Sequence, residues 1–117
     1  MLRLWRATIN TRNGLAFAIR SEAAVREEIG ALFLSLPLAW VIGATAMRRL
    51  ELVAAVALVL IVELLNTAIE KLADRLTTEH DLQIGRVKDM GSAAVGVALV
   101  TAGLFWLFAI AERMGVI

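Results

Sequence analysis

Three long apolar runs constrain the fold of this chain more than any other feature. Residues 29–47 contain no charged side chain, and neither do residues 90–111. The third run, 52–72, is free of polar side chains only as far as position 62, because Glu63 follows. A helix of about 20 apolar residues spans the hydrocarbon core of a bilayer. We therefore predict an all-α integral membrane protein with three transmembrane helices in a single membrane domain, residues 1–117.

The composition agrees with this class. The 117 residues are 60% hydrophobic and include no cysteine, so disulfides and thiolate metal sites are excluded. The net charge of +1 argues neither for nor against nucleic acid. A membrane protein of this size is nevertheless a poor candidate for binding it.

Residues 1–28 predict an amphipathic helix that lies in the membrane interface. Five arginines alternate with apolar residues there, and Trp5 suits the headgroup boundary. No apolar block has the length of a signal peptide, so we expect no cleaved leader. The stretch Asn-Thr-Arg-Asn-Gly at 10–14 is a poor helix former and predicts a turn. The alternative for this segment is a simple anchor whose acidic residues, Glu22 included, are only solvated.

The distribution of basic residues predicts the orientation. The N-terminal segment and the loop 71–89 lie on one side of a three-span protein and carry nine lysines and arginines, against three on the other side. The positive-inside rule places those two segments in the cytoplasm. Glu63 lies fourteen residues beyond Arg49, or roughly 21 Å of helical rise, which puts it in the inner third of the bilayer.

A polar stripe ends the second span. Its four residues are three, four and four positions apart and fall within an arc of about 80° on a helix; they are Glu63, Asn66, Glu70 and Asp74. Ionised carboxylates facing lipid are costly, so the stripe should face protein or a wet cleft. Because three spans are few to enclose it, self-association is expected. The alternative is a polar packing seam between helices.

Other polar residues belong to the same membrane face. The loop supplies Glu79, His80 and Asp81, and the next span begins with Lys88, Asp89 and Ser92. Several carboxylates with few basic partners favour a hard cation such as Mg²⁺, which completes its shell with water and phosphate oxygens. His80 is a lone histidine in a polar loop and is expected to be solvated. Ala94, Ala98 and Ala102 recur every fourth residue, a spacing that permits close helix packing.

No soluble-kinase or P-loop motif is present, but three blocks resemble the prokaryotic diacylglycerol kinase family. They are SEAAVREE at 21–28, ELLNTAIEKLAD at 63–74 and GRVKDMGSAAV at 85–95. Their order agrees with the family, and the similarity covers nearly the whole chain. The resemblance implies a small, homotrimeric, three-span lipid kinase of the bacterial cytoplasmic (inner) membrane. It implies the use of Mg²⁺ and ATP, with active sites shared between subunits.

The resemblance also implies residue roles. Glu63 matches the general base for the lipid hydroxyl, and Glu22 and Glu70 match the residues that hold the metal of the metal–ATP complex. The other nucleotide-binding positions correspond to Arg3, Asn10, Glu79, His80, Asp81, Lys88 and Asp89. Arg3, Asn66, Asp74 and Ser92 are expected to line the same site.

Other functions remain open at this stage. Undecaprenol kinase performs the same reaction on a polyprenol, and the sequence does not settle the acceptor. A proton or cation conduit would also place carboxylates in a membrane, but it needs polar groups through the outer half of the spans, and residues 52–62 offer none. A non-catalytic membrane assembly subunit is a third possibility.

Overall fold

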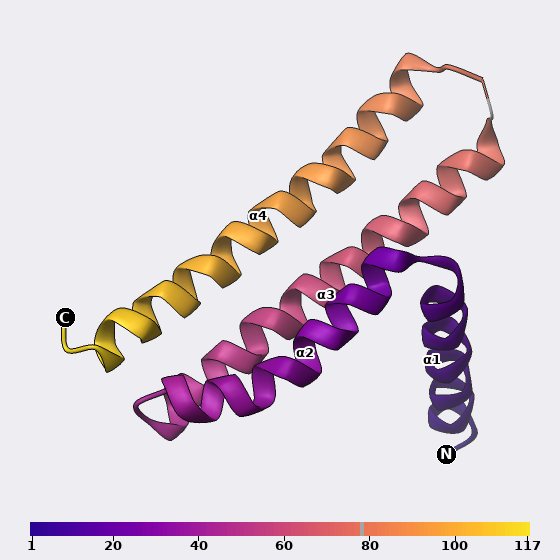
Figure 1. The fold of residues 1–117 in the computed structure, drawn as a ribbon. Coiled ribbons are helices and arrows are strands. Elements are labelled where there is room, and N and C mark those ends of the chain that lie inside the picture. The colour runs from indigo at the N-terminus through magenta and orange to yellow at the C-terminus, as the bar shows by residue number, and fades with distance from the viewer. Residues whose placement is uncertain (78) are drawn as a thin grey trace.

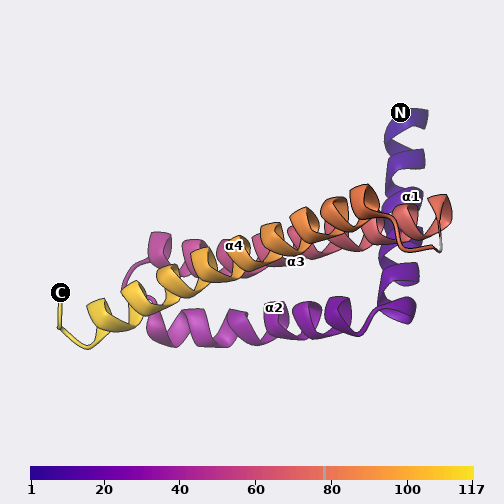
Figure 2. The same ribbon diagram turned by 90° about the horizontal axis from the view of Figure 1, so that it is seen from above.

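The chain folds into four helices, in a computed structural model that describes residues 1–77 and 79–117 (Figure 1). In order these are α1 (Leu2–Ser21), α2 (Ala23–Ile42), α3 (Ala46–Leu76) and α4 (Leu82–Arg113). Successive long helices α2, α3 and α4 run in opposite directions, with α3 packed against both of the others. Helix α1 lies across one end of this bundle (Figure 2). The prediction of an all-α chain is therefore confirmed.

The two ends of the bundle differ in what they contain. We call the end crossed by α1 the site end, because the expected site residues at the end of α3 and the start of α4 belong to it. The opposite end, the far end, holds the connection 43–45 and the C-terminus.

Helices α3 and α4 are each long and apolar enough to cross a membrane. Only 28% of the apolar stretch of α3 and 11% of that of α4 is buried within the chain, which is unlike the core helix of a soluble protein. Helix α2 begins with Ala23 and includes Arg26, Glu27 and Glu28. Its uncharged part, 29–42, is therefore only roughly 21 Å long.

The end of α2 differs from the expected span over 29–47. The helix stops at Ile42, and Ala46 and Met47 already belong to α3. The chain turns tightly at Gly43, where a Cβ would lie 2.8 Å from the carbonyl oxygen of Ala39. Thr45 then caps α3 by accepting a hydrogen bond from the backbone N–H of Arg48 at 3.0 Å. An apolar run shows no sign of such a turn, so hydropathy alone placed the boundary too late.

Helix α1 is continuous through 10–14, so the predicted turn there is wrong. The helix ends instead at Glu22, whose backbone is extended (φ −129°, ψ 118°). The guanidinium of Arg26 donates hydrogen bonds to the carbonyl oxygens of Ile19 (2.7 Å) and Arg20 (3.4 Å) across this break. Those carbonyls have no partner within the helix, and the arginine supplies one. The change of direction between α1 and α2 therefore depends on a side chain from the second helix.

Small residues allow α3 and α4 to pack closely. Ala98 and Ala102 are buried against Ala55 and Val59 in the middle of the bundle, as the four-residue spacing predicted. Ala94, one turn nearer the site end, is exposed. A second buried cluster, nearer the far end, joins all three long helices through Ala39, Leu52 and Ala109.

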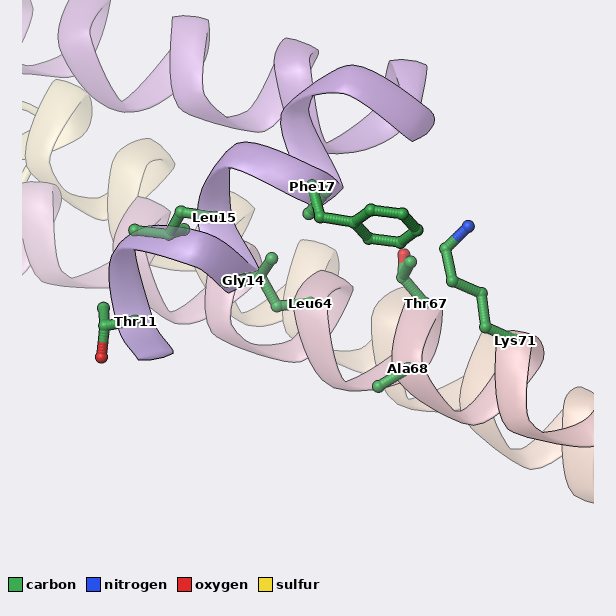
Figure 3. A pocket seen from close by; sticks show the side chains of 9 residues that line it. Thr11, Gly14, Leu15, Phe17, Leu64, Thr67, Ala68 and Lys71 are labelled. Carbon is green, nitrogen blue, oxygen red and sulfur yellow. The ribbon is translucent and has the colours of Figure 1, made fainter. Parts of the chain in front are cut away.

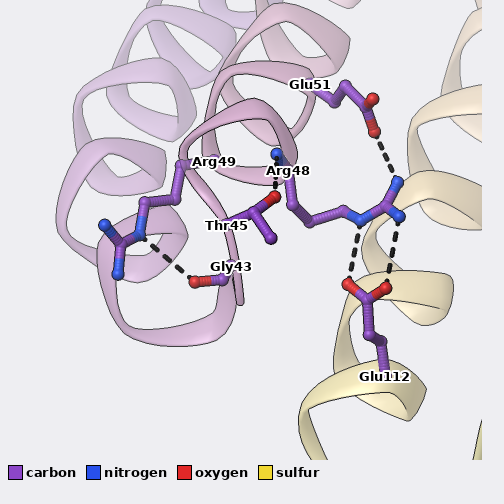
Figure 4. A network of polar contacts seen from close by, with 6 residues as sticks. All are labelled: Gly43, Thr45, Arg48, Arg49, Glu51 and Glu112. Atoms are coloured by element: carbon purple, nitrogen blue, oxygen red, sulfur yellow. Dashed lines mark hydrogen bonds and ion pairs between the residues drawn. The ribbon is translucent and has the colours of Figure 1, made fainter.

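A polar network ties α3 to α4 at the far end (Figure 4). The guanidinium of Arg48 donates to both carboxylate oxygens of Glu112, at 3.0 and 3.3 Å, and to Glu51 at 2.6 Å. Arg48 also lies 4.6 Å from the centre of the Phe108 ring. The neighbouring Arg49 donates to the carbonyl oxygen of Gly43 at 3.2 Å and stacks on Trp40. A two-point arginine–carboxylate contact has a defined geometry, so it holds the two helices in one register.

We predict that Glu112→Gln lowers the melting temperature of the purified protein in detergent micelles. The amide keeps the shape of the side chain but loses the charge-assisted contacts with Arg48. Arg113→Met is the matched control, because Arg113 is exposed at the same end of α4. Equal melting temperatures for the two variants would contradict a stabilising role for the Arg48–Glu112 contact.

Candidate active site

The polar stripe lies on about the last four turns of α3, at the site end. Asn66 is buried, Glu63 and Glu70 are half-buried, and Asp74 is exposed. The amide nitrogen of Asn66 donates a hydrogen bond to Oε1 of Glu70 at 3.2 Å. This bond orients the Glu70 carboxylate one turn beyond the amide. The stripe therefore begins among apolar residues and ends in an exposed position, as its helical spacing predicted.

Asn66 is also in contact with α4. Its side chain lies against Gly91, where a Cβ would collide with the amide oxygen. That oxygen is buried and has no hydrogen-bond partner in the part of the chain described. Buried polar atoms are nearly always paired, so this oxygen, packed against Gly91, is an exception among the described residues.

Four carboxylates from three parts of the chain form an acid cluster, which we define as Glu22, Glu28, Glu63 and Glu70. Glu22, Glu28 and Glu70 all lie close enough to Glu63 for mutual charge repulsion. Glu22 occupies the break before α2, and Glu28 follows it in the first turns of that helix. Partial burial raises the pKa of Glu28 above its ordinary value, and the charge of Glu27 adds to this effect. The break at Glu22 thus brings carboxylates of the N-terminal half to the stripe on α3.

Two lysines pair with carboxylates of this end. The ammonium of Lys71 lies 2.9 Å from Oε1 of Glu22, and joins α3 to the break between α1 and α2. The ammonium of Lys88 lies 2.5 Å from Oδ1 of Asp74, and joins the start of α4 to the end of α3. Both lysines are half-buried.

An apolar cavity of about 530 Å³ lies between α1 and α3 beside these groups (Figure 3). Leu15, Phe17 and Leu64 form much of its wall, and Lys71 stands at one end of it. The other lining residues are Thr11, Gly14, Ala18, Thr67 and Ala68. Leu64 directly follows Glu63 in the sequence. The cavity therefore offers an apolar surface next to a cluster of charged groups, as an amphiphilic ligand requires.

Several expected site residues stand apart from the acid cluster. Arg3 and Asn10 are exposed on the N-terminal half of α1, which extends away from α3 and α4 in both views. Asp81 caps α4 by accepting a hydrogen bond from the backbone N–H of Ile84 at 3.0 Å. The remaining four are exposed at or near the connection into α4: Glu79, His80, Asp89 and Ser92.

The donor set at the site end fits a hard cation that brings its own further ligands. Within residues 1–77 and 79–117, no three carboxylate or imidazole side chains are close enough to hold a metal ion by themselves. Mg²⁺ in phosphate-transfer sites takes one or two carboxylates and completes its shell with water and phosphate oxygens. Glu22 and Glu70, the two residues that the family resemblance assigns to the metal, are half-buried carboxylates of the acid cluster. A metal that arrives with a nucleotide suits this set better than a resident metal would.

Sequence reasoning missed three residues of this end: Glu28, Lys71 and Gly91. Lys71 follows Glu70 directly and lies beside the stripe on the helical wheel, so its position was available from the spacing. The pairing of Lys71 with Glu22 could not be predicted from the sequence, because 49 positions separate the two residues. The contact of Gly91 with Asn66 likewise joins two helices and has no local signal.

Comparison with known proteins gives one family. The sequence pattern of the prokaryotic diacylglycerol kinases matches residues 10–110. The chain is 39% identical to the diacylglycerol kinase of Escherichia coli (strain K12) over 97% of its own length and 93% of that protein. It is 36% identical to the diacylglycerol kinase of Haemophilus influenzae, over 91% and 90% of the two chains. With the diacylglycerol kinase of Pseudomonas aeruginosa the identity is 38%, over 89% and 85%.

We predict that Gly91→Ala destabilises the site end. The new methyl group must displace the buried Asn66 side chain, at a cost on the order of 1–3 kcal/mol for an overpacked contact. Gly96→Ala on the same helix is the control, because a Cβ there has no neighbour within 4 Å. Denaturant unfolding in mixed micelles measures the difference. If Gly91→Ala unfolds with the same midpoint as Gly96→Ala, Asn66 is not held by this contact.

Proposed function

Since the chain belongs to the prokaryotic diacylglycerol kinase family, we propose that it phosphorylates the hydroxyl of diacylglycerol with ATP and releases phosphatidic acid at the inner face of the membrane. The observation that carries this proposal is the arrangement of Glu63 and Glu70. They stand two turns apart on one helix, next to both an apolar cavity and an acid cluster. One helix thereby presents carboxylates at two depths, for a lipid acceptor and for a nucleotide.

Glu63 is the proposed general base. The hydroxyl of a membrane lipid lies at headgroup depth, and Glu63 is the deeper and half-buried of the two carboxylates. In the reaction, Glu63 accepts the proton of the hydroxyl as the lipid oxygen bonds to the γ-phosphorus of ATP. The bond from that phosphorus to the β–γ bridging oxygen breaks, and ADP leaves.

Glu22 and Glu70 are proposed to hold the metal of the metal–ATP complex. The hydrogen bond from Asn66 at 3.2 Å keeps the Glu70 carboxylate in place for this role. Charge neutralisation on the phosphates would come from Mg²⁺ when it is bound with ATP. Lys88 adds a positive charge at the same end, and its contact with Asp74 positions its ammonium.

The other nucleotide contacts are proposed on the family resemblance alone. They are Arg3, Asn10, Glu79, His80, Asp81 and Asp89, and Ser92 is proposed to line the site. Asp81 uses one carboxylate oxygen as the cap of α4, which leaves the other oxygen for a ligand. Arg3 and Asn10 lie on the half of α1 that extends away from α3 and α4, so a neighbouring subunit is the natural completion of the site.

The cavity between α1 and α3 is proposed to hold an acyl chain of the lipid. Its wall includes Leu15, Phe17 and Leu64, and burying such a chain is favourable at roughly 25 cal/mol per Å² of apolar surface. A lipid lying there would bring its hydroxyl towards Glu63, which precedes Leu64 in the chain. Helix α1, lying across the bundle, would rest in the interface, with the N-terminus and the loop 71–89 cytoplasmic.

The acceptor is tested by supplying the purified protein with Mg²⁺–ATP and either diacylglycerol or undecaprenol. The names of the relatives favour diacylglycerol, so phosphatidic acid should form at the higher kcat/KM. Faster phosphorylation of undecaprenol would replace the proposed acceptor while keeping the chemistry. Absence of phosphoryl transfer to both lipids would overturn the proposed function.

Two substitutions distinguish the proposed role of Glu63 as the general base from that of Glu70 as a metal ligand. Glu63→Gln removes the base and keeps the shape, so kcat should fall by roughly 10²- to 10⁴-fold while the apparent affinity for metal–ATP changes little. Glu70→Gln should instead weaken metal–ATP binding and recover partly at high Mg²⁺. Near-normal turnover of Glu63→Gln with diacylglycerol would show that Glu63 is not the base.

A homotrimer with shared sites is proposed on the family resemblance, and the separation of the expected site residues within one chain supports it. Two inactive variants, Glu22→Gln and Glu63→Gln, should therefore recover part of the activity when they are mixed in one oligomer. Cross-linking verifies that mixed oligomers have formed. Verified mixed oligomers without recovered activity would mean that each site is built from one chain.

A further inference from the structure

The acid cluster requires a positive partner when no ligand is bound. At the site end Glu63 lies within range of the charges of the other three carboxylates of the acid cluster, and all four side chains are half-buried. Carboxylates that lose water without gaining a partner destabilise the folded chain. A cation of this chain must therefore supply the balancing positive charge.

Lys71 is the cation whose ammonium pairs with the cluster. Its Nζ lies 2.9 Å from Oε1 of Glu22 and 5.1 Å from the centre of the Phe17 ring. Figure 3 shows its long side chain extending from α3 towards this ring, at the edge of the apolar cavity. The aromatic face on α1 therefore gives the ammonium a second attractive surface.

Other nearby cations are engaged elsewhere. The Arg26 guanidinium donates to carbonyl oxygens at the end of α1. Lys88 pairs with Asp74, the exposed end of the polar stripe. Lys71 is thus the side chain that neutralises Glu22, one of the two residues proposed to hold the metal.

We propose that Lys71 is a built-in counter-ion that occupies Glu22 in the unliganded protein and competes with the metal of the metal–nucleotide complex for that carboxylate. This inference rests on the proposed function, because it needs Glu22 to be a metal ligand. Because the Lys71 ammonium lies against one carboxylate oxygen of Glu22, its positive charge repels a divalent cation that approaches the same carboxylate. Lys71 therefore lowers metal affinity while protecting the empty site from charge repulsion.

The solvent exposure of the Lys71–Glu22 ion pair determines how strongly Lys71 lowers the affinity for the metal. The side chains of Lys71 and Glu22 are 39% and 32% exposed. Ion pairs that remain partly in water are weak, so the metal can replace the lysine. The four-carbon stem of lysine can swing aside without moving α3. Replacing the ammonium should tighten metal binding by about two- to fivefold, the fold-change that a weak, partly exposed pair allows.

The test measures binding rather than turnover. Full-length protein in detergent micelles is titrated with the Mn²⁺ complex of a non-hydrolysable ATP analogue at physiological ionic strength, and bound Mn²⁺ is followed by electron paramagnetic resonance. Lys71→Met removes the charge and keeps an apolar stem for the cavity. Lys71→Arg keeps the charge. Arg75→Met is the matched control, because Arg75 is an exposed cation one turn further along α3, and salt screens an exposed charge strongly.

Lys71→Met should bind the complex about two- to fivefold more tightly than wild type, while Lys71→Arg and Arg75→Met stay within about twofold. Equal tightening in Lys71→Met and Arg75→Met would assign the effect to overall charge and overturn the proposal. Unchanged or weaker binding in Lys71→Met would also overturn it. If the wild-type protein binds no metal–nucleotide, the proposed function itself fails, and this result is distinct from a failure confined to Lys71.

Discussion

Charge compensation at one end of an apolar helix bundle is the constraint on which the rest of this structure depends. Carboxylates in a membrane are costly unless they meet water, a cation or hydrogen-bond donors. The acid cluster gathers its carboxylates from three parts of the chain, and the extended backbone at Glu22 makes this possible. The Arg26 side chain stabilises that break by binding the carbonyl oxygens at the end of α1. The bend and the site are therefore consequences of the same local geometry.

The two ends of the bundle are built for different purposes. At the far end, Arg48 donates hydrogen bonds to Glu51 and Glu112, and apolar residues of three helices are buried together. At the site end, a buried oxygen of Asn66 has no partner among the described residues, and an apolar cavity opens between α1 and α3. Tight packing at one end holds the register of α3 and α4. At the site end, the cavity between α1 and α3 leaves room for a ligand.

This division explains how one small chain could serve a lipid and a nucleotide together. A helix that continues from an apolar bundle into the headgroup zone presents its side chains at successive depths. In the proposed function Glu63 faces the lipid and Glu70 faces the nucleotide, and Asn66 lies between them with a hydrogen bond to Glu70. Phosphoryl transfer needs mainly positioning and charge neutralisation. In the proposed function the protein therefore supplies a series of polar side chains along α3. The lysines neutralise part of the negative charge of the neighbouring carboxylates.

The sequence by itself determined what depends on periodicity and composition. Apolar runs predicted an all-α chain, the spacing of Glu63, Asn66 and Glu70 predicted their common face, and Ala98 and Ala102 predicted a close helix contact. Only the tertiary structure decided the continuity of α1, the turn at Gly43 and the pairing of Lys71 with Glu22. The low helix propensity of residues 10–14 did not interrupt α1, although these residues are exposed. The ion pair joins residues 49 positions apart, and such a contact exists only once the bend at Glu22 has brought α1 and α2 against α3, because no local pattern encodes the distance between two helices.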